Sequence, residues 1–232
     1  MSIGGNPQTR RIATQFADRV IDHPWVLIAE KARAWAASQV EHDWILILDP
    51  DEVMSENTAK EIRRMIASEP DLAAIEMRFD YFFRGRRLDY CMWRNTWVTR
   101  VFRRDRVRFV DQVHTAVDIH GVTRRISDKP EFWVKHYWKD SFTELFESHL
   151  RYVAVEGIAR YSRGEHFSWR RMIHEAWQMF RYNFISTRGC LGGTPGWFLS
   201  FFMTWYEAAS WLSLRRHERQ LREQRTQFQT GE

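Results

Sequence analysis

Cysteine is scarce in this 232-residue sequence, and the two that occur, Cys91 and Cys190, do not form a CxxC pair. This excludes a zinc site built on cysteines, and it excludes the disulfide framework that is typical of small secreted domains. Residues 1–20 contain no long apolar run of the kind found in a signal peptide. These absences favour a protein that stays on the cytoplasmic side of the membrane.

The sequence also lacks internal repeats, long low-complexity linkers and any recognised nucleic-acid-binding module. Its formal net charge is nevertheless +5, and it contains 12 Trp and 16 Phe. A basic chain suits phosphorylated ligands, anionic lipids or nucleic acid. Without a nucleic-acid module, we expect phosphorylated ligands and lipids and no nucleic acid.

Helix and strand signals alternate in the first half, which predicts an α/β fold. The apolar run Trp44–Leu48 is typical of a buried central strand in a parallel sheet. Ser55 is expected to cap a helix that ends near Ala67. Further strands are predicted at 74–81, 97–102 and 132–136. Helical spacing dominates from residue 141, so we expect an α/β domain over 1–140 and a helical region over 141–232.

The acidic turn Asp49-Pro50-Asp51-Glu52 follows the apolar run. Ligands of open α/β sheets bind outside the carboxyl ends of the strands. Carboxylates two residues apart can face one hard divalent ion, and Mg²⁺ or Mn²⁺ shares oxygen ligands with phosphates. The pattern alone is equally compatible with a solvated turn that leads into the next helix.

The segment 44–66, WILILDPDEVMSENTAKEIRRMI, resembles the metal-binding strand, loop and helix of glycosyltransferase family 2. The subgroup that it resembles contains the lipopolysaccharide-core and polysaccharide enzymes. RRIATQFADRVIDHPW and AEKARAWA resemble the segments that precede this element in the family. DYFFRGRRLDYCMWRNTWVTRVFRR, FVDQVHTAV and VKHYW resemble the acceptor-side and histidine-containing segments that follow. The ordered series covers roughly residues 9–215.

The resemblance implies a GT-A fold with a Rossmann-like mixed sheet, a nucleotide-sugar donor and inverting transfer. It also implies Mn²⁺ or Mg²⁺ as cofactor. By position, Asp49, Asp51 and His136 are the expected metal ligands. Arg33, Asp49 and Arg100 are the expected donor-binding residues. For His136, a hydrogen-bonding role without metal is the alternative.

The catalytic base and the acceptor site are less defined. Thr115 stands where relatives carry a glutamate, so the base is open between Asp111 and Asp80. Tyr90, Trp93 and His114 are the expected acceptor-binding residues. Packing in a core is the alternative for the two aromatic residues.

The resemblance weakens at the N-terminus. The family has a first strand and a DSGSTD-like loop, whereas this sequence has Gly4-Gly5-Asn6-Pro7-Gln8-Thr9 at the corresponding place. We therefore expect an N-terminally incomplete sheet. A truncated or degenerate relative that binds a membrane or a partner without catalysing a reaction is the alternative to an enzyme.

A strongly aromatic helix is predicted over Trp197–Leu214, followed by a basic segment from Arg215 to Arg225. Such a helix suits the membrane interface, and its basic extension suits anionic headgroups. The residues expected to enter the lipid are Trp197, Phe201, Trp205 and Trp211. The alternative is a helix docked on the catalytic domain. With the resemblance, this predicts a peripheral enzyme at the inner face of the membrane that acts on a lipid-linked or lipopolysaccharide glycan.

Overall fold

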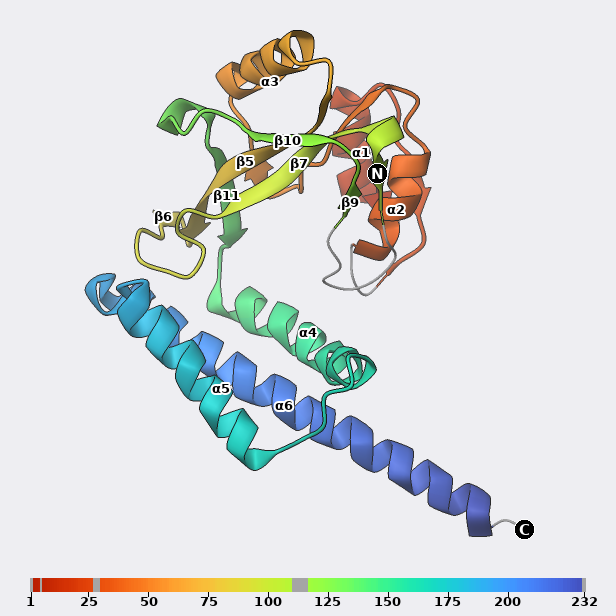
Figure 1. Cartoon of the computed structure of the whole chain (residues 1–232), viewed down its shortest axis with the longest axis vertical. Coiled ribbons are helices and arrows are strands. Elements are labelled where there is room, and N and C mark those ends of the chain that lie inside the picture. Colours follow the sequence, from red (N-terminus) through yellow and green to blue (C-terminus); the bar gives the residue numbers. More distant parts are fainter. Residues whose placement is uncertain (1, 5, 27–29, 110–116, 231–232) are drawn as a thin grey trace. The chain divides into compact units, whose positions relative to one another are not determined.

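The computed structural model, drawn in Figure 1, describes residues 2–4, 6–26, 30–109 and 117–230. The candidate residues Asp111 and His114 lie outside this part of the chain. The chain divides into two compact units, each described here by itself. The first unit contains residues 1–49, 55–77 and 97–132, and the second contains 50–54, 78–96 and 133–232. The predicted helical region therefore falls wholly within the second unit.

The first unit is a mixed α/β structure. Its helices are α1 (Pro7–Phe16), α2 (Glu30–Ser38), α3 (Glu56–Ser68) and the 3-10 turns Arg104–Arg106 and Pro130–Phe132. Its strands are β1 (Ser2–Ile3), β2 (Asp22–His23), β3 (Trp44–Leu46), β7 (Trp97–Arg103), β8 (Val107–Arg108), β9 (Asp118–Ile119), β10 (Val122–Arg125) and the first half of β5 (Leu72–Phe83). β3 is antiparallel to β7, and β10 is parallel to the start of β5. The mixture of directions agrees with the predicted α/β class.

Helix α3 begins as the sequence predicts. The Ser55 hydroxyl accepts a hydrogen bond from the Thr58 backbone amide at 3.1 Å, which satisfies one of the free donors at the helix N-terminus. Ser55 also donates to the carbonyl of Glu131 at 2.7 Å. Ile62 and Met65 form the buried side of the helix. The cap and this apolar stripe together hold α3 against its unit.

The prediction that Trp44–Leu48 is a buried central strand of a parallel sheet is wrong. β3 covers only Trp44–Leu46 and pairs with β7 in the antiparallel direction. Among the described strands it stands at the end of the order. Ile45 packs against Ala74 and Phe102, while Leu46 is 41% exposed. Alternating residues point to opposite faces of a strand, so an unbroken apolar run does not establish burial on both faces.

The second unit joins a smaller sheet to a helical layer. Its elements are β4 (Glu52–Val53), the second half of β5, β6 (Arg86–Arg87), β11 (Val134–Lys139), α4 (Phe142–Ser162), α5 (Trp169–Arg181), a π-helical turn (Tyr182–Ser186), a 3-10 turn (Gly189–Leu191) and α6 (Gly193–Thr230). β11 is parallel to β5 and antiparallel to β4. Strand β5 is thus the one element that continues from the first unit into the second.

Helix α6 packs against both α4 and α5 (Figure 1). Gly157 of α4 allows a close crossing, because a Cβ atom there would lie 2.5 Å from the backbone of Ser213 in α6. Phe202 and Trp211 of α6 are buried, at 3% and 0% exposure. On one side α6 thus packs within its own unit, on α4 and α5 and, through Leu199, Phe202 and Met203, in a cluster with Phe83, Leu88 and Cys91. Docking on a catalytic domain stays a prediction. The expectation that Trp211 enters lipid is wrong, because its ring is enclosed within the helical layer.

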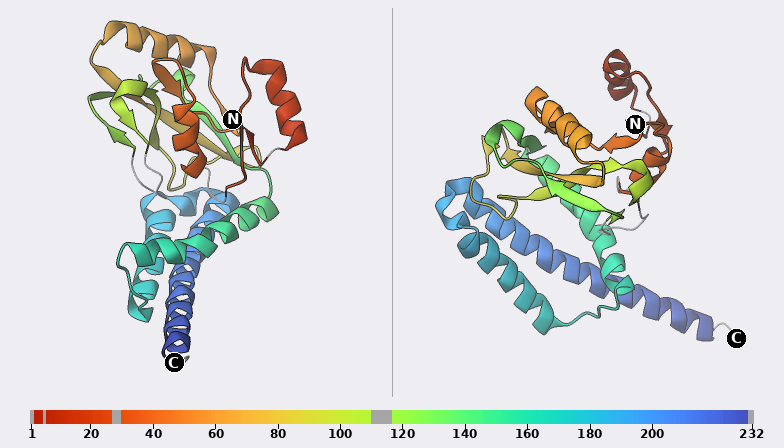
Figure 2. Two further views of the ribbon diagram at one scale, coloured as in Figure 1. Left: turned by 90° about the vertical axis from the view of Figure 1, so that its right-hand side faces the viewer. Right: turned by 45° about the horizontal axis from the view of Figure 1, so that its top comes forward.

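Figure 2 shows α6 from two further directions, and it lies beside α5 in both. Its aromatic part continues without a break into the basic extension, so the predicted segments 197–214 and 215–225 belong to one helix of 38 residues. Among the described residues, no helix is both long enough and apolar enough to cross a bilayer.

Candidate functional site

In the first unit, the three predicted donor-binding residues lie together. Arg33 comes from α2, Asp49 follows β3, and Arg100 comes from β7. One terminal nitrogen of Arg33 lies 3.0 and 2.9 Å from the two carboxylate oxygens of Asp49. Arg100 donates to Asp49 Oδ2 at 3.2 Å, and its side chain is only 11% exposed. Both oxygens of Asp49 are thus engaged by guanidinium groups.

This arrangement separates the two aspartates of the predicted metal motif. A carboxylate that already accepts charge-assisted hydrogen bonds from two arginines is poorly placed to ligate a cation as well. Asp49 fits the role of positioning Arg33 and Arg100, whose guanidinium groups are suited to phosphate oxygens. The prediction of a metal ligand is thus less favoured for Asp49 than for Asp51.

In the second unit, Asp51, in the turn just before β4, lies beside His136 of β11. The backbone amide of Tyr137 donates to the carbonyl of Asp51 at 2.8 Å, and Glu52 lies opposite His136 in the β4–β11 register. His136 Nε2 is then 3.3 Å from Asp51 Oδ2. Two predicted metal ligands, 85 positions apart in the sequence, are brought side by side by this short antiparallel ladder.

The environment of the Asp51–His136 pair favours an ionised carboxylate. Burial tends to raise the pKa of the Asp51 carboxyl, but the hydrogen bond and charge of His136, with help from Lys139, hold that pKa below its ordinary value of 3.8. The side chain of Asp51 is 38% exposed, so a ligand can reach it. Glu52 has a fully buried side chain, with Oε1 3.8 Å from His136 Nδ1.

Asp51 Oδ2 and His136 Nε2 are spaced as two adjacent ligands of one divalent cation would be. Neighbouring corners of an octahedral Mg²⁺ or Mn²⁺ site are about 3 Å apart, close to the separation of Asp51 Oδ2 and His136 Nε2. His136 Nδ1 is buried, and it finds no hydrogen-bond partner among the described residues. Within the same part of the chain, no group of three His, Cys, Asp or Glu side chains forms a preassembled metal site. A cation at this position would need its remaining ligands from water or from a phosphorylated substrate.

An aromatic layer lies behind His136. Tyr81, which is opposite His136 in the β5–β11 register, has its ring centroid 4.8 Å from the imidazole. Trp93 stacks on Tyr81 at 5.8 Å and contacts Trp138 at 4.4 Å. Trp93 therefore packs in the core of the second unit, which is the alternative that the sequence left open for it. The half-buried Tyr90 has the guanidinium of Arg94 5.6 Å above its ring.

The candidate bases are not resolved by this arrangement. Asp80 accepts a hydrogen bond from Arg87 at 3.1 Å across the β5–β6 hairpin, so one of its oxygens is occupied. Asp111, the other candidate, and His114, the third acceptor-binding residue, lie outside the described residues. The identity of the base stays a prediction.

The sequence analysis missed Tyr81, Trp138 and Lys139 as neighbours of the candidate site. The period-two spacing of Val134, His136 and Trp138 places these side chains on one face of β11. That spacing is visible in the sequence and could have identified Trp138. The pairing partner of β11, and with it Tyr81, could not be read from the sequence.

A buried histidine at the far end of the aromatic layer gives a pH-dependent prediction. His149 packs against Trp138 and Phe202, and its Nδ1 lies 2.8 Å from the carbonyl of Leu145. Burial is the main cause that holds the pKa of His149 below 6.5. The hydrogen bond to the Leu145 carbonyl raises this pKa, whereas the positive charge of Lys139 lowers it further.

Because the folded pKa of His149 is depressed, its full contribution to stability is present above pH 6.5 and is lost as the pH falls toward the folded value. We expect the urea midpoint of the wild-type chain to fall over this window, and the fall to be smaller in His149→Gln. Equal pH profiles for the two proteins would contradict this assignment.

Comparison of the sequence with protein-family models and with curated proteins of known function gave no significant match.

Proposed function

We propose that this chain is a nucleotide-sugar-dependent glycosyltransferase of the GT-A type, in which Asp51 and His136 hold the divalent cation. The observation that supports the proposal most is the 3.3 Å approach of these two side chains. The family resemblance assigns both of them to the metal site from separate motifs, and the β4–β11 pairing brings those motifs together.

The residues of the chain have distinct roles in this proposal. Asp51 supplies the charged oxygen ligand, and His136 supplies a nitrogen ligand, which suits Mn²⁺ better than Mg²⁺. The ring of Tyr81, 4.8 Å from the imidazole between centroids, limits the orientations of that imidazole. Arg33 and Arg100 carry N–H groups suited to phosphate oxygens, and Asp49 fixes their side chains. When bound, the cation would offset the charge that develops on a departing nucleoside diphosphate.

The acceptor in this proposal is a lipid-linked or lipopolysaccharide glycan, and the transfer is inverting. Inverting transfer uses a general base, here proposed to be a carboxylate, that takes the proton of the acceptor hydroxyl as this hydroxyl attacks the anomeric carbon. Asp80 and Asp111 remain the two candidates for that base.

One observation favours the alternative of a non-catalytic relative. Arg33 and Arg100 occupy both oxygens of Asp49, the first acid of the expected metal motif. A degenerate protein could keep this cluster for stability alone.

A screen of sugar nucleotides with the whole chain separates the two candidates. We expect one class of sugar nucleotide to raise the melting temperature, and to bind in calorimetry, only when Mn²⁺ or Mg²⁺ is present. Nucleotides without the sugar should show the same metal dependence, because the diphosphate makes the contact. If no sugar nucleotide binds, or if binding is unchanged by a chelator, the proposal fails and the non-catalytic alternative is favoured.

A further inference from the structure

Helix α5 presents part of its apolar side to solvent. Trp169, Ile173 and Trp177 follow one another at four-residue spacing and are 52%, 63% and 58% exposed. The inward side of the same helix carries Glu175, which accepts a hydrogen bond from the indole of Trp211, and Met179, which packs in the core. An amphipathic helix normally buries its apolar stripe. Part of the apolar stripe of α5, with Met172, Ala176 and Met179, is half-buried, whereas Trp169, Ile173 and Trp177 are left exposed, which indicates that another surface covers these three side chains.

The exposed stripe of α5 continues onto α6. Phe180 contacts Phe201 at 5.3 Å between ring centroids, and Phe184 in the following turn contacts Trp197 at 4.9 Å. Phe201 and Trp197 are 54% and 49% exposed. These contacts join two helices into one continuous apolar surface.

The same surface extends to α4 on the other side of α6. Phe146 of α4 contacts Trp205 of α6 at 5.4 Å, and the two side chains are 39% and 37% exposed. Leu150, one turn further along α4, is 54% exposed. We call this surface the aromatic face and define it by Phe146, Ile173, Trp177, Trp197, Phe201 and Trp205. An exposed apolar patch that spans three helices marks an interaction site.

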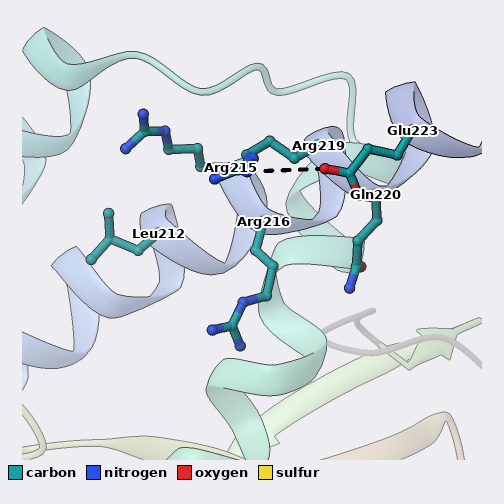
Figure 3. Close-up of a pocket in the computed structure, with 6 residues that line it drawn as sticks. All are labelled: Leu212, Arg215, Arg216, Arg219, Gln220 and Glu223. Carbon is teal, nitrogen blue, oxygen red and sulfur yellow. Dashed lines mark ion pairs between the residues drawn. The ribbon is translucent and has the colours of Figure 1, made fainter. Parts of the chain in front are cut away.

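A basic cluster adjoins one end of the aromatic face. The guanidinium of Arg215 lies 4.9 Å above the ring of Trp169, the first residue of α5. Figure 3 shows Arg215, Arg216 and Arg219 around a shallow hollow on α6, beside the exposed Leu212. Arg219 pairs with Glu223 at 4.0 Å, drawn as the dashed line in Figure 3. Exposed arginines also flank the stripe of α5 at positions 170 and 181.

We propose that the aromatic face lies in the interfacial layer of an anionic membrane, with α5 and the first half of α6 in the membrane plane and the basic cluster on the lipid phosphates. Exposed Trp side chains are typical of the bilayer interface, and adjacent Arg side chains are attracted to anionic headgroups. A second copy of the chain is a poorer occupant, because its own arginines would meet those of the first. The inference is independent of the transferase proposal.

Sedimentation with lipid vesicles tests this inference directly. The whole chain should pellet with vesicles of phosphatidylcholine and phosphatidylglycerol in equal parts, and much less with phosphatidylcholine alone. High salt should release part of it, because the arginine contribution is screened. Arg215→Glu/Arg216→Glu should bind weakly and with little dependence on salt.

A matched pair of variants locates the lipid contact. Ile173→Glu/Trp177→Glu should weaken binding about tenfold or more, because it places two charges on the apolar stripe. Ile12→Glu/Phe16→Glu makes the same kind of change on α1, where the two side chains are 53% and 85% exposed, and should bind as the wild type does. Circular dichroism and urea midpoints should be near the wild-type values for both, since all four side chains are exposed.

Three outcomes would overturn the proposal. The first is that the α5 variant pellets as much as the wild type. The second is that pelleting does not depend on the charge of the lipid. The third is that the wild type forms a dimer and does not pellet, and that the α5 substitutions convert this dimer to a monomer. The last result would assign the aromatic face to a second copy. Because the readout is lipid binding, a failed sugar-nucleotide screen leaves this result unaffected.

Discussion

Replacement of Arg160 by methionine should lower the free energy of unfolding by about 3–5 kcal/mol, because it leaves the largely buried carboxylate of Glu207 and the half-buried carboxylates of Glu165 and Glu175 without their counter-charge. The Arg160 side chain is 9% exposed and bonds to Glu207 and to Glu165, at 2.9 Å for the latter. It also lies 3.4 Å from Glu175, which in turn accepts the indole N–H of Trp211. These contacts link α4, α5 and α6 around one guanidinium group.

The pH dependence of this loss has a defined sign. Burial is the main cause that raises the pKa of Glu207 above 4.5, while Arg160 opposes it. Without Arg160, the penalty for an ionised Glu207 grows; it sets in as the pH rises above the unfolded value of 4.5 and is complete once the pH exceeds the raised folded pKa. The difference in urea midpoint between wild type and Arg160→Met should therefore be largest near neutral pH and should shrink on acidification.

The matched control is the double variant Arg160→Met/Glu207→Gln, which removes the charge that the single change leaves uncompensated. It should recover part of the lost stability. An exposed arginine, Arg163→Met, should cost little, because surface ion pairs contribute about 0–1 kcal/mol. If Arg160→Met is as stable as Arg163→Met, the network does not hold the helical layer together.

Replacement of Asp51 by asparagine should weaken Mn²⁺-dependent binding of a nucleoside diphosphate on the order of 100-fold or more. Loss of an outer-shell partner already costs about 10–100-fold in metal affinity, and Asp51 is proposed as a direct ligand. The substitution keeps the size of the side chain and removes its charge. The change should appear in calorimetry with Mn²⁺ present, and it should leave any metal-independent binding unaltered.

Asp140→Asn is the control for this result, because Asp140 is an exposed aspartate of the same unit, just beyond β11. His136→Gln should reproduce the loss, since it removes the second proposed ligand. Urea midpoints near that of the wild type would show that the loss is not caused by unfolding. Binding that survives in both Asp51→Asn and His136→Gln would remove the metal assignment.

The parts of the fold predicted best were those set by local chemistry. Ser55 caps α3 as expected, and the helical region predicted from residue 141 begins with α4 at Phe142. The position of β3 in the sheet was predicted wrongly, because the run Trp44–Leu48 carries no information about which strands pair with it. The exposure of Trp169, Ile173 and Trp177 on α5 was missed for a related reason. Helical spacing identifies an apolar stripe but not the surface that covers it.

For the candidate site too, the sequence anticipated some contacts and missed others. The resemblance selected Asp51 and His136, and β4–β11 pairing brings them together. It also selected Asp49 as a metal ligand, whereas the structure places two guanidinium groups on that carboxylate. The hydrogen bonds of Arg33 and Arg100 to Asp49 join distant parts of the sequence, so the spacing within the acidic motif could not predict them.

Proton NMR of the His136 ring in the presence of Mn²⁺ tests the central claim most directly, because it requires no turnover. The ring signals of His136 are assigned by their absence from the His136→Gln spectrum. With a nucleoside diphosphate present, substoichiometric Mn²⁺ should broaden these signals before those of the exposed His174, which lies on α5 of the same unit. The selective broadening should disappear in Asp51→Asn. Signals of His136 that stay sharp while Mn²⁺ and the nucleotide bind, or that broaden equally in Asp51→Asn, would contradict a metal site at Asp51 and His136.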